Sequence, residues 1–221
     1  MNKLKLSGIQ HNLLEQHLFP GDGKEAVAIA LCGRNAWEND HTLTVRELLL
    51  IPYDQCIERK PDLVRWPTEL INGLLAKAAE RDYAIVKIHC HPGGGEFFSE
   101  YDDYSDQELF SSVHVWLDSD QPHGSCIMLP GGRMFGRFFL PDMKPQSIDI
   151  ISVAGSDIKQ WIYTSDTEFN EQLHARNLQA FGKKTVAILS QMRIGVIGCS
   201  GTGSIVIEQL KRLGVGELVL I

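Results

Sequence analysis

Apolar residues fall along the chain in short runs that predict alternating helices and strands. The opening MNKLKLSGIQHNLLEQHLF spaces its apolar residues in a way typical of an amphipathic helix. Helices are also expected over residues 68–81 and from Ser99 to Trp116, where acids gather at the helix start. Apolar and β-branched runs predict strands at 25–33, 43–53, 83–90, 124–129, 132–140 and 148–153.

The pattern changes after about Ser156. Residues 167–192 are mostly helical in pattern, with an interruption near Gly182. A strand at 193–198, a glycine-rich loop, an amphipathic helix and a final strand ELVLI follow. The order predicts a mixed α/β domain over 1–155, a connector over 156–166, and the first strand–helix–strand of a second domain over 167–221.

Composition narrows the class of protein. The 221 residues are 43% hydrophobic and 22% charged, as in an ordinary globular protein. A net charge of −7 argues against a nucleic-acid partner, and no apolar stretch predicts a membrane span or a secretory signal. The five cysteines form no C-x-x-C pair, which argues against a disulfide framework and a cysteine-rich zinc site. A cytoplasmic location is expected.

Two histidines at the end of a strand are the first candidates for chemistry. His89 and His91 occupy alternate positions, so both side chains face the same way, and Pro92 ends the pairing. Asp102, near the start of a predicted helix, can supply a third ligand. Two imidazoles and a carboxylate leave one zinc position open for water, as in catalytic sites. A polar strand end with no metal is the alternative for a bare H-x-H pair.

The order His89-x-His91-Pro92, a spacer, then Ser99-x-x-Asp102 resembles the JAMM motif of the JAB/MPN metallopeptidases. The resemblance covers roughly residues 5–155 and implies a mixed-sheet, cytidine-deaminase-like α/β fold. It implies that His89, His91 and Asp102 bind zinc. It also implies that Ser99 helps to stabilise the oxyanion formed when hydroxide attacks an amide carbonyl.

The same family uses an upstream glutamate that takes a proton from water and delivers it to the leaving amine. Glu25, which opens EAVAIALCG, fits this role best. Gly33 lies one residue further from Glu25 than is common in the family, and a slip of one residue turns a strand side chain to the opposite face unless a bulge absorbs it. Asp22 and Glu47 are the other candidates.

The C-terminal glycine-rich loop has two interpretations. Gly198, Gly201 and Gly203 stand between a strand and a helix, which suits phosphate binding but also close strand–helix packing. The run from Arg176 onward resembles the opening of a Rossmann-like ThiF domain, the adenylating domain of ubiquitin-activating enzymes. The resemblance implies that Arg176 contacts phosphate. The ribose-binding acid is expected beyond Ile221, so ATP is expected only in a complete domain, and the chain alone is not expected to adenylate a substrate.

These resemblances imply a zinc isopeptidase that cleaves after the C-terminal glycine of a ubiquitin-like protein, fused to an activating domain. Expected partners are a ubiquitin-like protein or its conjugates, with no nucleic acid or membrane, and a homodimer through the ThiF-like part. The alternative is a non-catalytic MPN scaffold or a regulatory module for the activator. The four polar motif residues His89, His91, Ser99 and Asp102 favour the enzyme.

Overall fold

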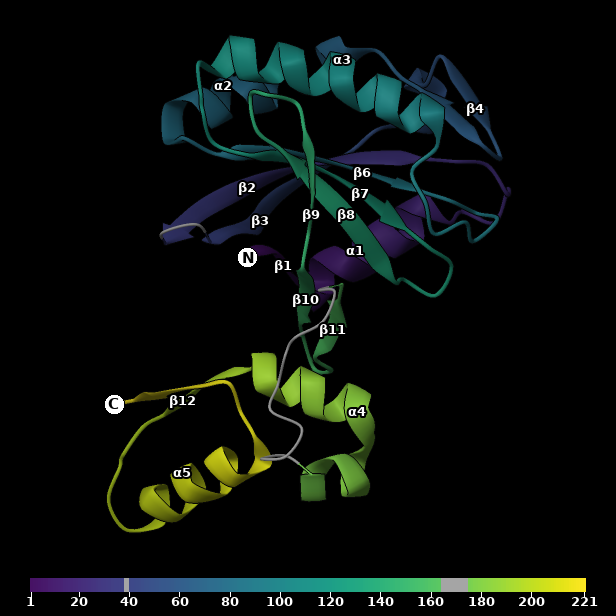
Figure 1. The fold of residues 1–221 in the computed structure, drawn as a ribbon. Coiled ribbons are helices and arrows are strands. Elements are labelled where there is room, and N and C mark those ends of the chain that lie inside the picture. Colours follow the sequence, from purple (N-terminus) through teal and green to yellow (C-terminus); the bar gives the residue numbers. More distant parts are fainter. Residues whose placement is uncertain (38–39, 164–174) are drawn as a thin grey trace. The chain divides into compact units, whose positions relative to one another are not determined.

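A computed structural model describes residues 1–37, 40–163 and 175–221, which divide into two units, Met1–Tyr163 and Thr164–Ile221. In the first unit a curled mixed sheet lies between helix α1 (Gly8–Leu18) on one face and helices α2 (Asn72–Arg81) and α3 (Glu100–Leu117) on the other (Figure 1). This unit is therefore a mixed α/β layered domain, as the sequence predicts.

Nine strands form the sheet within the described part of this unit, in the order β11-β10-β1-β3-β2-β6-β7-β8-β9. Pairs β1–β10, β1–β3 and β6–β7 are parallel, and the other pairs are antiparallel. The strands are β1 (Asn2–Ser7), β2 (Val27–Trp37), β3 (Asp40–Leu50), β6 (Ala84–Cys90), β7 (His123–Met128), β8 (Met134–Phe139), β9 (Pro145–Ser147), β10 (Ile150–Ala154) and β11 (Lys159–Ile162).

The central strands are buried on both faces, which explains their nearly continuous apolar sequences. In β2, Ala28 and Ala30 belong to the core beneath α1, whereas Val27 and Ile29 belong to the core beneath α2 and α3. Strand β6 alternates in the same way, and its seven residues are all buried. One face of β6 therefore packs toward α1 and the other toward α2 and α3, and His89 lies on the face toward α3.

The opening segment is the main correction to the expected elements. Residues 2–7 form strand β1 rather than the start of a helix, because Leu4 and Leu6 alternate into the core while the strand pairs between β10 and β3. Helix α1 begins only after Ser7, whose side chain forms a capping box with Gln10. A strand, β11, occupies part of the expected connector 156–166 and pairs with β10.

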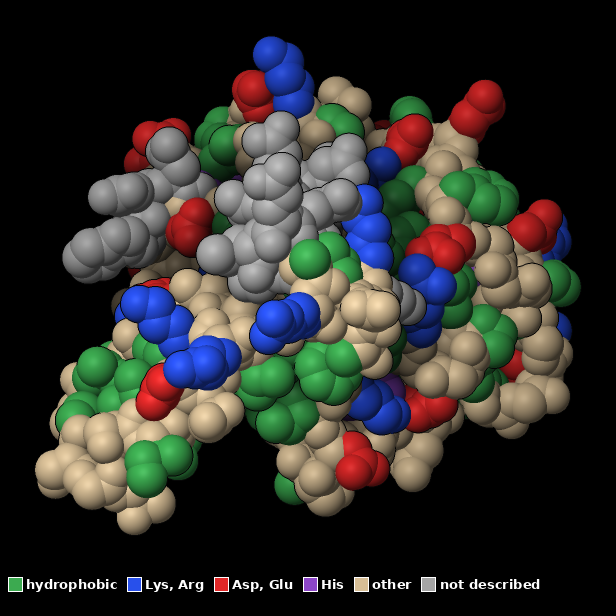
Figure 2. Space-filling view, turned by 60° about the horizontal axis from the view of Figure 1, so that its bottom comes forward, with side chains coloured by type: hydrophobic (Ala, Val, Ile, Leu, Met, Phe, Trp, Pro, Cys, Tyr) green, Lys and Arg blue, Asp and Glu red, His purple; other side chains and the backbone are tan. Residues whose placement is uncertain are grey.

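Short elements complete the first unit. A β4–β5 hairpin (Glu58–Lys60 and Leu63–Arg65) and two 3₁₀ turns, Tyr53–Gln55 and Thr68–Ile71, connect β3 to α2. No helix in the described ranges is long and apolar enough to cross a membrane. On the face visible in Figure 2, basic side chains are interspersed with acidic and apolar ones.

The second unit contains the expected strand–helix–strand. Strands β12 (Arg193–Val196) and β13 (Glu217–Leu220) are parallel, and helix α5 (Thr202–Leu213) connects them. Helix α4 (Ala175–Gln191) precedes them and is interrupted at Gly182, whose φ is 80°. The part of the expected helical segment over 167–174 lies outside the described residues.

Candidate metal centre

The imidazoles of His89 and His91 meet at the end of β6. Their Nε2 atoms are 3.3 Å apart, and both side chains are nearly buried. Two nitrogens bound to one tetrahedral zinc are separated by about 3.3 Å, since each Zn–N bond is about 2.05 Å long. The pair therefore has the spacing that two ligands of a single zinc ion need.

Asp102 reaches the same point from the first turn of α3. Its Oδ1 lies 2.9 Å from His89 Nε2, and its Oδ2 lies 3.6 Å from His91 Nε2. Ser99 caps the helix, and its Oγ accepts a hydrogen bond from the backbone N–H of Asp102 at 3.1 Å. In return, Asp102 Oδ2 accepts from the Ser99 backbone N–H at 2.8 Å and from the Ser99 hydroxyl at 2.7 Å. The helix cap thus orients the carboxylate toward the imidazoles.

Glu25 lies beside the two histidines and is only 5% exposed. Its Oε1 is 3.7 Å from His91 Nε2. Because Val27 pairs with His89 in the antiparallel β2–β6 register, Glu25 precedes β2 on the same face as both histidines. Asp22 and Glu47, the other candidates, bind Arg59 and Lys77 on the surface instead.

A bulge does interrupt the pairing of β2 with β3, but its extra residue does not lie in β2. Leu31 pairs with Glu47 and Cys32 with Val45, so Arg46 of β3 is the extra residue. The β2–β6 register is continuous over the same residues. The bulge therefore does not turn Glu25 away from the histidines.

Two carboxylates compete for the role of third ligand. One oxygen of Glu25 and one nitrogen each of His89 and His91 lie within 4.8 Å of one another. Asp102 approaches both imidazoles more closely, at 2.9 and 3.6 Å, whereas Glu25 is 3.7 Å from His91. Either carboxylate could therefore join the two histidines in holding a metal, and Asp102 lies nearer to them.

Hydrogen bonding fixes the ring of His91. Its Nδ1 lies 2.8 Å from the carbonyl oxygen of Gly95, and a carbonyl can only accept, so Nδ1 carries the proton. In the neutral ring, Nε2 then carries a lone pair that could bind a metal, whereas donation from Nε2 to Asp102 requires the charged ring. His89 Nδ1 is buried and has no hydrogen-bond partner among the described residues.

Burial and neighbouring groups shift the pKa values of the four side chains in different directions. Burial lowers the pKa of His89, which favours the neutral ring. Burial opposes the Asp102 carboxylate, but hydrogen bonds from His89 and His91 outweigh it and hold the pKa of Asp102 well below its usual range. For His91, burial is outweighed by hydrogen bonds to Asp102 and Gly95, and its pKa is raised. Burial also raises the pKa of Glu25 to about 8, although His91 opposes the shift.

The β4–β5 hairpin holds the backbone of Glu25, a feature that no sequence motif indicates. The Glu25 N–H donates to the carbonyl of Lys60 at 2.8 Å, and Arg59 Nε donates to the Glu25 carbonyl at 2.8 Å. Arg59 also binds Asp22 at 2.9 Å and lies over the ring of Tyr53, 4.2 Å from its centroid. The hairpin thus fixes the residue that faces His91.

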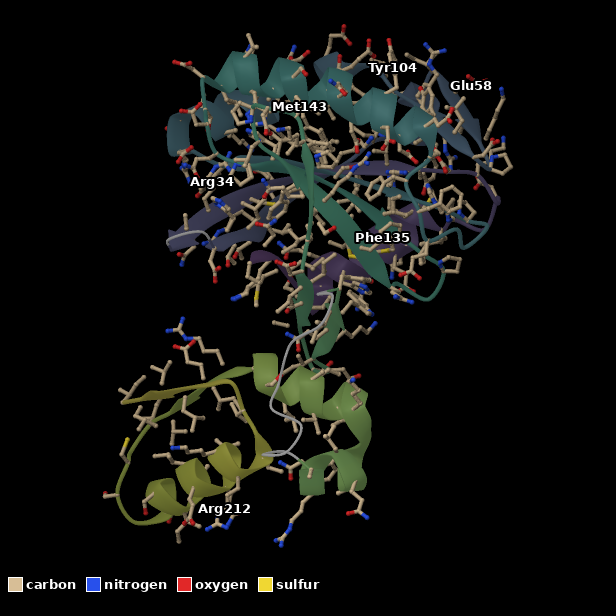
Figure 3. All side chains as sticks on the ribbon, viewed as in Figure 1. Arg34, Glu58, Tyr104, Phe135, Met143 and Arg212 are labelled. Atoms are coloured by element: carbon tan, nitrogen blue, oxygen red, sulfur yellow. The ribbon has the colours of Figure 1, made fainter. Side chains whose placement is uncertain are left out.

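A groove of about 920 Å³ adjoins the centre, between the hairpin and α2 on one side and α3 on the other. Val64, Trp66 and Tyr101 line both this groove and the small cavity around Glu25 and His89. Figure 3 labels Tyr104 on α3, one of the residues that line the groove.

In the second unit, the glycine-rich loop has a packing explanation. A Cβ on Gly203 would lie 1.7 Å from the carbonyl oxygen of Gly198, so the loop and α5 approach too closely for any other residue. Gly198 and Gly201 have φ of 86° and 53°. Arg176 is exposed near the start of α4. These positions agree with close strand–helix packing and do not by themselves indicate a nucleotide.

One comparison with known protein families matches part of the first unit. The family model described as prokaryotic homologs of the JAB domain matches residues 12–130, more than half of the chain. These residues contain the histidine pair, both carboxylates and Ser99, whereas the glycine-rich loop lies outside them. No curated protein sequence matches the chain.

One similar solved structure is the solution structure of protein DSY2949 from Desulfitobacterium hafniense. It is 14% identical, covers 69% of this chain and 94% of its own, and has a TM-score of 0.46.

Proposed function

The chain belongs to the family of prokaryotic homologs of the JAB domain, and on this basis we propose that it is a zinc-dependent isopeptidase. Its substrate would be the bond after the C-terminal glycine of a ubiquitin-like protein. The observation that carries the proposal is the convergence of His89, His91 and Asp102, with the buried Glu25 beside them.

Each residue of the centre has a separate task in this proposal. His89, His91 and Asp102 would hold zinc, which lowers the pKa of water from about 15.7 to about 7 when bound in such a site. Glu25 Oε1 would accept a proton from water and return it to the leaving amine. Ser99 would stabilise the oxyanion. Its hydroxyl binds Asp102 here, so this role requires the hydroxyl to change partner.

The surroundings of the centre support a polypeptide substrate with glycine at the bond to be cleaved. The cavity bounded by Glu25, His89 and Asp102 has a volume of about 10 Å³, room for about one water molecule. This cavity would hold the attacking water, and the narrow approach to it leaves little room for a side chain on the residue at the bond. The adjoining groove offers Val64, Trp66 and Tyr101 to the apolar side chains of the segment before that glycine.

Cleavage of a set of ubiquitin-like proteins with short C-terminal extensions tests the proposal. The zinc-loaded chain is expected to cut after the terminal glycine, to lose activity in a chelator, and to regain it with zinc. The His89→Ala/His91→Ala variant is expected to be inactive throughout. Cleavage that survives the chelator would contradict the mechanism. Failure to cleave any member of the set would favour the non-catalytic scaffold.

For the second unit we propose a ThiF-like nucleotide-binding start that would join modifier cleavage to modifier activation. The parallel β12 and β13 with the connecting helix α5 support this proposal. Arg176, Gly198 and Gly201 would face the phosphates. Saturable binding of ATP by a complete ThiF-like domain, weakened by Arg176→Ala, would support the proposal, and no saturable binding by that complete domain at millimolar ATP would contradict it.

A further inference from the structure

The two halves of helix α3 are attached to the sheet by different forces. In its second half, Leu109, Phe110 and Val113 are buried in the apolar core. Over residues 100–108, all of which are described, the buried side chains are Asp102 and Asp106. The half of the helix that carries the candidate zinc ligand is therefore attached to the sheet through carboxylates.

Asp106 is fully buried between two cations from different strands. Lys87 of β6 forms an ion pair with its Oδ1. Arg137 of β8 donates to its Oδ2 from Nη2 at 2.7 Å and from Nε at 3.1 Å. The Arg137 guanidinium also binds Asp103 and lies over the ring of Phe98, 3.7 Å from its centroid. These contacts join α3 to two strands of the sheet at one residue.

The Lys87–Asp106 ion pair joins β6 to α3, as the contact between His89 and Asp102 does. Lys87 and His89 alternate along β6, so both face α3. Asp102 and Asp106 are four residues apart in α3 and lie on the same side of the helix. The pair Lys87–Asp106 therefore lies next to the pair His89–Asp102, about one helical turn along.

We propose that Asp106 is a positioning residue for the metal centre. Through Lys87 and Arg137 it fixes the first half of α3, and so holds Asp102 at the distance from His89 and His91 that zinc binding needs. Asp106 contacts neither the proposed ligands nor the groove. The inference depends on the proposed zinc centre and adds a residue that the motif does not contain.

Asp106 and the ligand Asp102 are the buried side chains over the described residues 100–108, so loss of the Asp106 charge weakens the attachment of this half-helix to the sheet. Lys87 would keep one neutral contact, with Ser105 Oγ at 3.4 Å. Arg137 would keep Asp103, whose side chain is 60% exposed. Residues that orient metal ligands from outside typically change metal affinity by about 10–100-fold when they are replaced. A weakening of this size is the expected result.

Zinc affinity of the full chain, measured by competition with a chromophoric chelator, tests the inference. Asp106→Asn keeps the shape and is expected to weaken zinc binding by about 10-fold or more. It is also expected to change the absorption spectrum of the Co²⁺-loaded protein at saturation. Arg137→Lys keeps a charge but loses the two-atom contact, and about a three-fold loss is expected. Urea unfolding of each variant is measured in parallel.

Arg34→Met is the matched control. Arg34 is another nearly buried cation, bound to the carbonyls of Pro122 and Tyr83, at the far side of the unit from Tyr104 and Glu58 (Figure 3). Its loss is expected to lower stability while zinc affinity stays within two-fold of the unmodified chain. An equal loss of affinity in Arg34→Met and Asp106→Asn would overturn the inference, because general destabilisation would then explain both.

The remaining outcomes separate the inference from the function on which it depends. If the unmodified chain binds zinc and Asp106→Asn and Arg137→Lys both stay within two-fold, the positioning role is wrong and the zinc centre stands. If Asp106→Asn does not fold, Arg137→Lys alone decides by the same criterion. If the unmodified chain binds no zinc, both proposals fail.

Discussion

The pKa values of Asp102 and Glu25, the two carboxyl groups of the centre, are shifted in opposite directions although both side chains are nearly buried. Asp102 receives hydrogen bonds from two imidazoles and stays ionised, whereas burial raises the pKa of Glu25 to about 8. Hydrogen bonds donated to a buried carboxylate favour its ionised form, whereas burial alone favours the protonated form. The arrangement therefore separates a permanent anion, suited to ligate a metal, from a group suited to exchange a proton.

Replacement of Glu25 by glutamine tests whether Glu25 transfers a proton or binds the metal. Glu25→Gln keeps the size of the side chain but cannot accept the proton, so the rate of hydrolysis is expected to fall by about 10²–10⁴-fold. Zinc affinity is expected to stay within about three-fold, because Asp102 rather than Glu25 is the proposed ligand. Turnover of a cleaved fusion and chelator competition measure the two quantities. Loss of zinc together with activity would instead make Glu25 a ligand.

His123 makes stability depend on pH. Burial, with Arg34 and His114 nearby, lowers its pKa to about 2. The unfolded chain, with a histidine pKa near 6.5, then binds one more proton than the folded chain below pH 6.5, so stability falls as the pH falls. Between pH 7.5 and 5 this one group is expected to remove about 2 kcal/mol.

The matched variant for this prediction is His123→Asn, which keeps an acceptor for the Ile85 backbone N–H, now bound to His123 Nδ1 at 3.0 Å. Urea unfolding at both pH values measures the slope. The pH-dependent loss of stability is expected to be about 2 kcal/mol smaller in the variant. An equal loss in both proteins would show that His123 is not the group responsible.

Among the elements, the hairpin β4–β5 controls Glu25 without touching the histidines. Arg59→Met removes the donor to the Glu25 carbonyl and the pair with Asp22, so Glu25 loses one side of its backbone support. Hydrolysis is expected to slow about ten-fold, with zinc affinity unchanged.

The control for the hairpin variant is Lys77→Met, which breaks an exposed ion pair with Glu47. Such surface pairs contribute about 0–1 kcal/mol, and no change in hydrolysis is expected. Steady-state turnover of both variants makes the comparison. Arg59→Met at the rate of the unmodified chain would show that the Lys60 contact alone holds Glu25.

Elements differ in how far their sequences reveal them. Strands β2 and β6 were predictable because burial on both faces gives nearly continuous apolar runs. Strand β1 was missed because its alternation is short and runs directly into α1. Strands β4, β5, β9 and β11 lie at edges or form a small hairpin, where exposed polar residues carry no apolar pattern.

The site residues also differ in how far the sequence alone predicts them. The motif spacing placed His89, His91, Ser99 and Asp102 together, because strand alternation and a helix cap are local features. The roles of Arg59 and Asp106 could not be predicted, since their contacts come from elements far apart in the chain. The bulge opposite Leu31 and Cys32 could not be predicted either, because its extra residue, Arg46, lies in β3 and not in the strand that follows Glu25.

For the whole molecule, zinc is expected to stabilise the folded chain because it binds a site that exists only after folding. At a free zinc concentration 100 times the dissociation constant, the gain is about 2.7 kcal/mol. For a unit of this size that corresponds to a rise in Tm of roughly 5–10 °C. Magnesium, which prefers oxygen ligands, is expected to have no effect. Thermal unfolding of the unmodified chain and of His89→Ala/His91→Ala checks the prediction, and an equal rise in both would contradict it.

The most direct test is a crystal structure of the zinc-loaded chain with anomalous diffraction measured on both sides of the zinc absorption edge. One anomalous peak is expected, bonded to His89 Nε2, His91 Nε2 and one oxygen of Asp102, with the fourth position open to solvent beside Glu25. A peak elsewhere in the chain, or Glu25 bonded to the metal in that fourth position, would contradict the proposed hydrolytic centre.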